Sequence, residues 1–247
     1  MSDISYHTMP DGRRIAFRLH QGEGPALVFL PGYMSDMEGS KAGALAEWAA
    51  RAGRTCLLLD YSGCGSSAGE FADGTLSRWR EEVISLIDAT IDGRVILIGS
   101  SMGGWLMLLI AERLGQRLAA LVGIAAAQDF SDWGFDAAQK AQLAAGETVF
   151  EDNPYGPEPT PTYAKFWQDA ETHRLLERSI AADCPVRLLH GQRDADVPWQ
   201  TSLRLAEALR SDDIQVSLVK SGDHRLSGDA EIALLLRIVG ELSDPID

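Results

Sequence analysis

The pattern with the clearest chemical potential is Gly99-Ser100-Ser101-Met102-Gly103, in which a serine lies two residues from a glycine on either side. It follows an apolar run at residues 94–98 and opens a helical pattern that begins near Gly103. A serine on a sharp turn between a strand and a helix exposes its hydroxyl, and the glycines let neighbouring backbone approach closely. We therefore predict that Ser101 is a nucleophile, with Ser100 one position out of register. An ordinary turn is the alternative.

A serine hydroxyl is a weak nucleophile that needs a general base, itself oriented by a third group. Around such a turn the chain order is serine, acid, histidine. Three histidines follow the candidate serine: His173, His190 and His224. His173 falls in an irregular segment, and His190 closes an apolar strand, where a structural histidine is expected. His224 lies in the loop after the last strand, so we predict that it is the base.

The acid is expected at the end of another strand, from which a carboxylate can reach the histidine loop. Asp194 follows the apolar run at residues 186–190 and is the predicted acid. Asp196 is a nearby alternative, and Asp129, after the run at residues 119–124, is a second one. Asp223 adjoins the histidine in sequence and is not expected to orient its ring.

Acyl transfer also needs hydrogen-bond donors for the oxyanion that forms on the attacked carbonyl. One predicted donor is the backbone N–H of Met102, the residue after the nucleophile. The second is the backbone N–H of Tyr33, in the turn Pro31-Gly32-Tyr33-Met34 that follows the first long apolar run. An ordinary tight turn is the alternative for this loop.

A second glycine-rich loop, Gly63-x-Gly65-x-x-Ala68, is compatible with a dinucleotide-binding turn. The loop continues without opening a helix, so no helix N-terminus is offered to a pyrophosphate. We therefore interpret it as a loop bordering the active site. Cys64, within it, has no cationic neighbour in sequence that would favour the thiolate. No cluster has the spacing of metal ligands, and we predict no metal and no cofactor.

Alternating apolar runs and helical patterns predict the elements that position these residues. Strands are expected at residues 26–30, 55–59, 94–98, 119–124, 186–190 and 214–219, and helices near 40–51, 75–91, 103–115, 200–210 and 228–242. Near-continuous apolar strands separated by helices indicate a doubly wound, mostly parallel sheet of the α/β class. Two earlier runs, residues 4–8 and 15–20, predict an antiparallel hairpin at the sheet edge.

The alternation of apolar runs and helical patterns stops at about residues 128–183, a segment too long for a plain connection. We interpret it as a lid inserted into a single domain that spans residues 1–247. Its aromatic residues include Trp133, Phe150, Tyr155, Tyr163, Phe166 and Trp167. Of these, Trp133, Phe166 and Trp167 are predicted to line a substrate pocket. The alternative is that they only pack the insertion against the body.

Composition narrows the classes of partner. The chain has 247 residues and a net charge of −14, which disfavours nucleic acid and anionic membranes as partners. Three cysteines are too few for a disulfide framework. No apolar run is long enough for membrane insertion, and the first residues resemble neither a signal nor a transit peptide. These features predict a cytoplasmic protein; oligomeric state is left open.

Together the motifs resemble the α/β-hydrolase family from end to end. The blocks at residues 31–35, 60–67, 99–108, 184–191 and 223–225 resemble the mitochondrial palmitoyl-protein thioesterases of its α/β-hydrolase-domain group, also known as acyl-glucuronide esterases. The resemblance implies a Ser101–His224–Asp194 triad and deacylation of a small acyl ester or thioester, or of an acylated protein. C–C bond hydrolysis or perhydrolysis on the same fold, and a non-catalytic binding module, are the alternatives.

Overall fold

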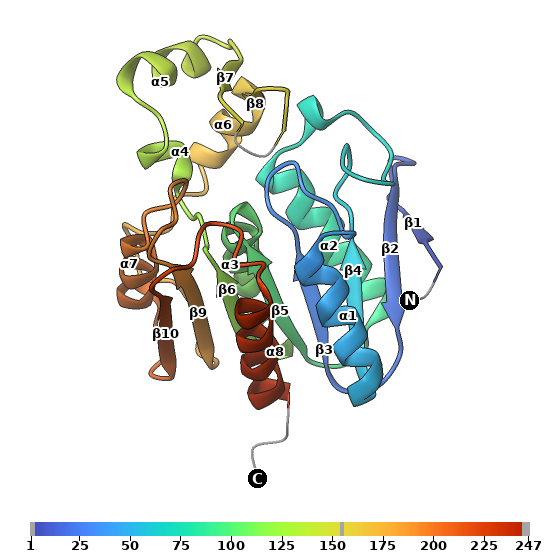
Figure 1. Cartoon of the computed structure of the whole chain (residues 1–247). Helices are drawn as coiled ribbons and strands as arrows, with labels where there is room; N and C mark the ends of the chain where they lie inside the picture. Colours follow the sequence, from blue (N-terminus) through green and yellow to red (C-terminus); the bar gives the residue numbers. More distant parts are fainter. Residues whose placement is uncertain (1–2, 154–155, 244–247) are drawn as a thin grey trace.

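A computed structural model describes residues 3–153 and 156–243. Its centre is an eight-stranded sheet in the order β1-β2-β4-β3-β5-β6-β9-β10 (Figure 1). The strands are β1 (Ser5–Thr8), β2 (Arg14–His20), β3 (Glu23–Leu30), β4 (Arg54–Leu59), β5 (Val95–Ser100), β6 (Leu118–Ile124), β9 (Val186–Gly191) and β10 (Ile214–Val219). The six strands from β4 to β10 are parallel, which confirms the predicted class.

The N-terminal strands form the predicted hairpin. β1 pairs with β2 in antiparallel register, and β2 continues antiparallel onto β4. The hairpin therefore extends one edge of the sheet without a helical crossover.

Helices cover both faces of the sheet. The helices α1 (Ser40–Ala52) and α8 (Asp229–Ser243) contact each other and pack on one apolar layer of the sheet. The other layer is covered by α2 (Leu76–Thr90), α3 (Met102–Leu114) and α7 (Gln200–Ala208). Helix α3 is buried along nearly its whole surface, because its sequence is apolar all round rather than on one stripe. This central helix fixes the turn that carries Ser101.

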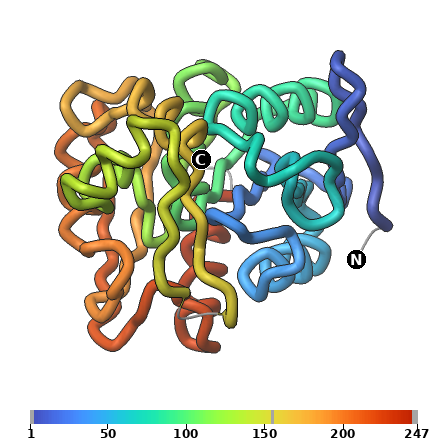
Figure 2. The backbone as a smooth tube through the Cα atoms, turned by 90° about the horizontal axis from the view of Figure 1, so that it is seen from above, coloured from blue at the N-terminus to red at the C-terminus, as the bar shows by residue number. Residues whose placement is uncertain are grey.

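The segment between β6 and β9 forms a cap over one end of the sheet. It contains α4 (Phe130–Trp133), α5 (Ala137–Ala144), α6 (Ala164–Glu171) and a small antiparallel sheet of β7 (Val149–Glu151) and β8 (Thr160–Thr162). Short 3-10 turns lie outside it at Phe71–Asp73 and Gly115–Arg117. Seen from above, the cap crosses the molecule between the β9–β10 side and the N-terminal half (Figure 2).

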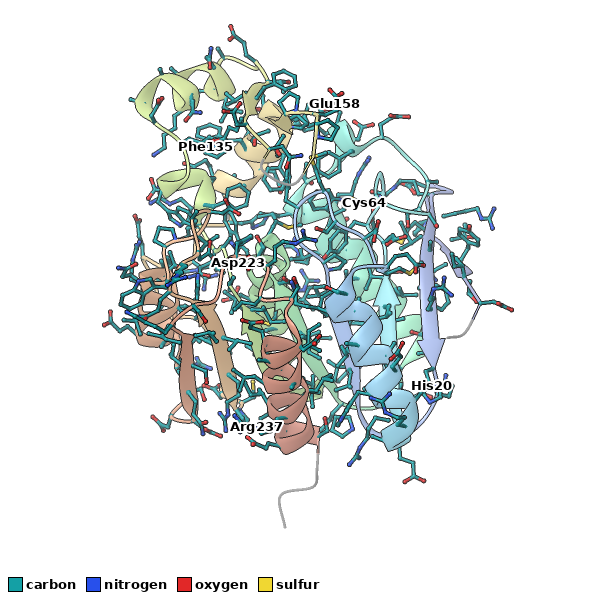
Figure 3. All side chains as sticks on the ribbon, in the orientation of Figure 1. His20, Cys64, Phe135, Glu158, Asp223 and Arg237 are labelled. Atoms are coloured by element: carbon teal, nitrogen blue, oxygen red, sulfur yellow. The ribbon has the colours of Figure 1, made fainter. Side chains whose placement is uncertain are left out.

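The carboxyl ends of the parallel strands meet beneath this cap. In an open parallel sheet this edge is where ligands bind, because the loops after successive strands converge there. Asp223, in the loop after β10, lies directly below the cap, whereas His20 and Arg237 lie at the opposite end of the sheet (Figure 3). Among the described residues, no helix is long and apolar enough to cross a membrane.

Candidate active site

The turn between β5 and α3 holds Ser101 in a strained conformation. Its backbone has φ 54° and ψ −123°, a region that residues with a side chain rarely adopt. The Ser101 N–H donates to the Ile124 carbonyl at 2.9 Å, and the Ala127 N–H donates to the Ser101 carbonyl at 3.0 Å. The end of β6 and the loop that follows it thus hold a conformation that would cost about 1–3 kcal/mol if unsupported.

The flanking glycines are required by close backbone approach. A Cβ on Gly99 would lie 2.4 Å from the Gly103 carbonyl oxygen. A Cβ on Gly103 would lie 2.1 Å from the Leu30 carbonyl oxygen and 2.4 Å from that of Pro31. The second glycine therefore lets the nucleophile turn pack against the loop that follows β3.

The structure brings Ser101, His224 and Asp194 into one hydrogen-bonded chain. His224 Nε2 lies 3.0 Å from Ser101 Oγ, and His224 Nδ1 lies 2.9 Å from Asp194 Oδ2. A carboxylate only accepts hydrogen bonds, so Nδ1 carries the hydrogen and Nε2 presents its lone pair to the serine hydroxyl. This is the tautomer in which an imidazole can take a proton from that hydroxyl.

The Asp194 carboxylate is fully buried and receives four donors. Oδ1 accepts the backbone N–H groups of Asp196 at 2.9 Å and Val197 at 2.8 Å. Oδ2 accepts from His224 at 2.9 Å and also faces His190 Nε2 at 3.1 Å. Burial raises the pKa of the carboxyl, but the hydrogen bonds from His190 and His224 outweigh it and hold the pKa well below its usual range. Asp194 is therefore ionised at neutral pH.

The two alternative acids have other positions. Asp129 accepts backbone N–H bonds from Leu175 at 2.8 Å and Leu176 at 2.8 Å, so its carboxylate ties the start of the cap to its end. Asp196 is exposed, and its backbone N–H supports Asp194. The carboxylate that His224 Nδ1 contacts at 2.9 Å is that of Asp194.

The loop that carries His224 is shaped by neighbouring charges. Asp223 Oδ1 accepts the backbone N–H groups of Arg225 at 3.0 Å and Leu226 at 3.1 Å, rather than facing the imidazole. Lys41, at the start of α1, donates to the Arg225 carbonyl. Burial and the neighbouring Arg225 lower the pKa of this ammonium group to about 8. The histidine loop is thus tied to the opposite helix layer.

The loop after β3 reaches the nucleophile. A Cβ on Gly32 would lie 3.3 Å from Ser101 Cβ, so Tyr33 begins directly beside the serine. The buried Tyr61 hydroxyl donates to the Pro31 carbonyl at 3.1 Å. Met102 is the first residue of α3, where backbone N–H groups have no partner within the helix. Met102 therefore lies at the turn that carries Ser101 and Tyr33 lies in the loop beside it; donation of their N–H groups to an oxyanion stays a prediction.

The Tyr33 side chain connects this loop to the cap. Its hydroxyl donates to the Pro161 carbonyl of β8 at 2.9 Å. Its ring contacts Phe71, Phe130 and Phe166, at centroid distances of 4.9, 6.3 and 5.0 Å. Burial raises the pKa of this hydroxyl, so it is a hydrogen-bond donor at any physiological pH.

The three predicted pocket residues occupy different environments. Phe166 is 1% exposed and joins the apolar layer beneath the cap. Trp167 packs against the cap's own small core, and its indole donates to the Ser131 carbonyl at 2.9 Å. The Trp133 indole donates to the Gln128 carbonyl at 2.9 Å. Contact with substrate stays a prediction for all three; Tyr155 lies outside the described residues.

The glycine-rich loop after β4 folds onto its own aspartate. The buried Asp60 accepts the N–H groups of Met37 at 2.7 Å and Ser66 at 2.8 Å. A Cβ on Gly65 would lie 2.2 Å from the Asp60 carboxylate, which leaves no room there for a pyrophosphate. Burial and the nearby Asp60 raise the pKa of the Cys64 thiol to about 12, so it is not a thiolate.

One group of carboxylate and imidazole atoms among the described residues has metal-compatible spacing. Ligand atoms of Asp194, Asp196 and His224 lie within 4.8 Å of one another. Two of these residues are already hydrogen-bonded to each other in the serine chain. The spacing therefore follows from that chain.

Sequence reasoning assigned His190 only a structural place. The structure places this buried histidine against the same carboxylate oxygen that His224 contacts. The available signal was its position four residues before Asp194, across the turn at the end of β9.

Residues 27–236 match the family model described as "Alpha/beta hydrolase family". The chain belongs to the alpha/beta hydrolase family. This confirms the predicted hydrolase class and the resemblance stated above.

Individual relatives show which proteins this chain is similar to. The chain is 37% identical to human "Palmitoyl-protein thioesterase ABHD10, mitochondrial" and 39% identical to its mouse counterpart, over 99% of this chain and 81% and 84% of those proteins. The structure of mouse alpha/beta hydrolase domain-containing protein 10 has a TM-score of 0.90 at 37% identity, covering 98% of each chain. A protein from Agrobacterium vitis S4, described as a hydrolase, has a TM-score of 0.91 at 35% identity, covering 98% of this chain and 100% of that one.

These relatives correct one expectation. The human and mouse proteins are both named as mitochondrial, which overturns the cytoplasmic location predicted from the sequence. The prediction was wrong because it relied on composition and the first residues. Compartment is set by an address that receptors read, and composition does not reveal such an address.

Proposed function

We propose that this protein hydrolyses acyl thioesters and esters through an acyl-enzyme on Ser101, with fatty acyl groups on cysteine as the favoured substrate class. The carrying observation is the continuous chain from Ser101 Oγ through His224 to the ionised Asp194. The names of the human and mouse relatives, palmitoyl-protein thioesterase, support this substrate class. The strained serine supports catalysis over a binding module, since passive binding gives no reason to maintain strain.

In the first step, Ser101 Oγ attacks the acyl carbonyl while His224 Nε2 takes its proton. Asp194 keeps the ring in the correct tautomer and stabilises the imidazolium that forms. The carbonyl oxygen becomes an oxyanion, which the N–H groups of Tyr33 and Met102 bind. Each such donor contributes about 2.7–4 kcal/mol to lowering the barrier.

The imidazolium then protonates the leaving thiolate or alkoxide, and the acyl group remains on Ser101. A water molecule enters, His224 removes its proton, and a second oxyanion collapses to release the acid and free serine. Bond changes balance without a metal or a redox partner.

The test is hydrolysis of S-palmitoyl peptide and of p-nitrophenyl acyl esters of increasing length. Ser101→Ala should lower kcat by several orders of magnitude without changing the melting temperature. Ser100→Ala is the matched control, because Ser100 is buried and adjacent to Ser101, whereas His224 Nε2 contacts the Ser101 hydroxyl; the variant should keep most activity. Equal activity of wild type and Ser101→Ala would refute the proposal.

A further inference from the structure

The triad acid has a second histidine behind it. His190, on β9, is fully buried, and its Nε2 lies 3.1 Å from Asp194 Oδ2 and 3.1 Å from the Val197 carbonyl oxygen. Both neighbours accept hydrogen bonds and neither donates. Nε2 therefore carries a hydrogen and points it at the carboxylate.

The other ring nitrogen faces a serine. Ser202 on α7 is 1% exposed, and its Oγ lies 2.7 Å from His190 Nδ1. A neutral imidazole with hydrogen on Nε2 has a lone pair on Nδ1, so the Ser202 hydroxyl donates to it. This contact selects the tautomer that donates to Asp194.

We propose that His190 and Ser202 are positioning residues for the triad acid. They complete a hydrogen-bonded relay, Ser101–His224–Asp194–His190–Ser202, in which a serine–histidine pair lies on either side of one buried carboxylate. The inference rests on the proposed function, because the effect on rate passes through Asp194 and His224.

The relay fixes the carboxylate in one orientation. The two backbone donors hold Oδ1, but of the two histidines only His190 is on a rigid strand; His224 is on a loop. Without His190, Oδ2 would depend on a partner carried by a loop, and the carboxylate would no longer define where the His224 ring must lie. Loss of His190 should lower kcat and leave KM unchanged, because no part of the relay beyond Ser101 touches substrate.

Turnover of three variants tests this directly. His190→Leu removes the donor and should lower kcat about tenfold to a hundredfold at unchanged KM, the range for one hydrogen bond to a charged group. His190→Gln places an amide N–H at the position of Nε2 and should recover most of the loss. Ser202→Ala should cause a smaller loss, about threefold to tenfold, because the tautomer is no longer selected.

Matched controls come from the same chain. His7 and Ser85 form a second histidine–serine contact, at 2.8 Å, between β1 and α2, and His7→Leu should keep wild-type kcat. Ser243 is buried at the end of α8 and donates to the Val239 carbonyl, so Ser243→Ala matches Ser202→Ala in burial. Melting temperatures separate loss of fold from loss of rate.

A readout independent of turnover is the ¹⁵N NMR spectrum of histidine-labelled protein. The chain has five histidines, and His190→Gln assigns the signal that disappears. We expect His190 as the Nε2–H tautomer in wild type, and a mixed tautomer in Ser202→Ala. This result supports the relay even where wild type fails to cleave the thioester, in which case only the proposed function is refuted.

Two outcomes overturn the inference. One is an Nδ1–H tautomer at His190 in wild type. The other is a kcat for folded His190→Leu that equals the wild-type kcat. The same holds if His190→Gln is impaired as much as His190→Leu, since restoring an N–H donor would then have no effect on the rate.

Discussion

Adding one methyl group at Gly103 should impair catalysis by displacing the oxyanion loop. A Cβ there would lie 2.1 Å from the Leu30 carbonyl oxygen and 2.4 Å from the Pro31 carbonyl oxygen. Ordinary contact begins near 3.4 Å, so the loop must retreat by more than 1 Å, and Tyr33 moves with it. A misplacement of roughly 1 Å costs about a hundredfold in rate, and the overpacking about 1–3 kcal/mol in free energy of unfolding.

The assay measures kcat and KM for p-nitrophenyl esters alongside urea unfolding. Gly103→Ala should lower kcat about a hundredfold in protein that remains folded. Gly43→Ala, in helix α1, is the matched control, because its Cβ would meet no atom within 4 Å. That control should gain about 1 kcal/mol in stability through helix propensity and keep its rate. Wild-type kcat in Gly103→Ala would refute the assigned role of the oxyanion loop.

Three further predictions concern charge and the cap. Asp194→Asn should lower kcat about 10⁴-fold by favouring the wrong His224 tautomer. The pKa of Asp194 is lower in the folded protein than in the unfolded chain, so its contribution to stability is complete above pH about 5 and is lost as the pH falls below 3.8. Acid unfolding of the variant should lack that component. Tyr33→Phe deletes the donor to Pro161 and should cost about 1 kcal/mol of stability by urea unfolding, with an increase in proteolysis of the cap. The pKa of Lys41 is lowered to about 8 in the folded protein, so the folded state loses the ammonium proton at a lower pH than the unfolded chain does. Above pH 8 the free energy of unfolding of wild type should therefore rise relative to that of Lys41→Met, by up to about 1.4 kcal/mol per pH unit. A difference in free energy of unfolding that stays constant between pH 8 and 10 would contradict this.

The sheet and the nucleophile turn were predictable because their signals are local. An apolar run, a glycine pair around Ser101 and an apolar helix occur consecutively in the chain, and each constrains the backbone without reference to distant residues. The same holds for His224, since the loop after the last parallel strand must begin at the carboxyl end of the sheet, where the Ser101 turn also lies.

The cap could not be read in the same way. Phe166 and Trp167 are adjacent in sequence, but neighbouring residues on a helix point about 100° apart, so one enters the body and the other the cap core. Composition identifies the segment as aromatic without indicating which face each ring occupies. The contact between His190 and Asp194 could not be predicted for a related reason. The sequence of an apolar strand that ends in histidine is the same whether or not the ring contacts a carboxylate beyond the strand end.

Asp129 and Asp194 show why local sequence leaves the acid ambiguous and how the structure separates the two. Both follow parallel strands, at the ends of β6 and β9, and both are buried. Burial dominates at Asp129 and raises the pKa of its carboxyl, whose donors are backbone N–H groups of the cap. At Asp194 two histidine donors reverse the effect of burial and lower the pKa. Only the second carboxylate is held as an anion against an imidazole, which is what stabilising an imidazolium requires. Asp129 cannot replace it without releasing the cap, so the two aspartates have separate tasks: Asp129 holds the cap, and Asp194, in the function we propose, orients the base.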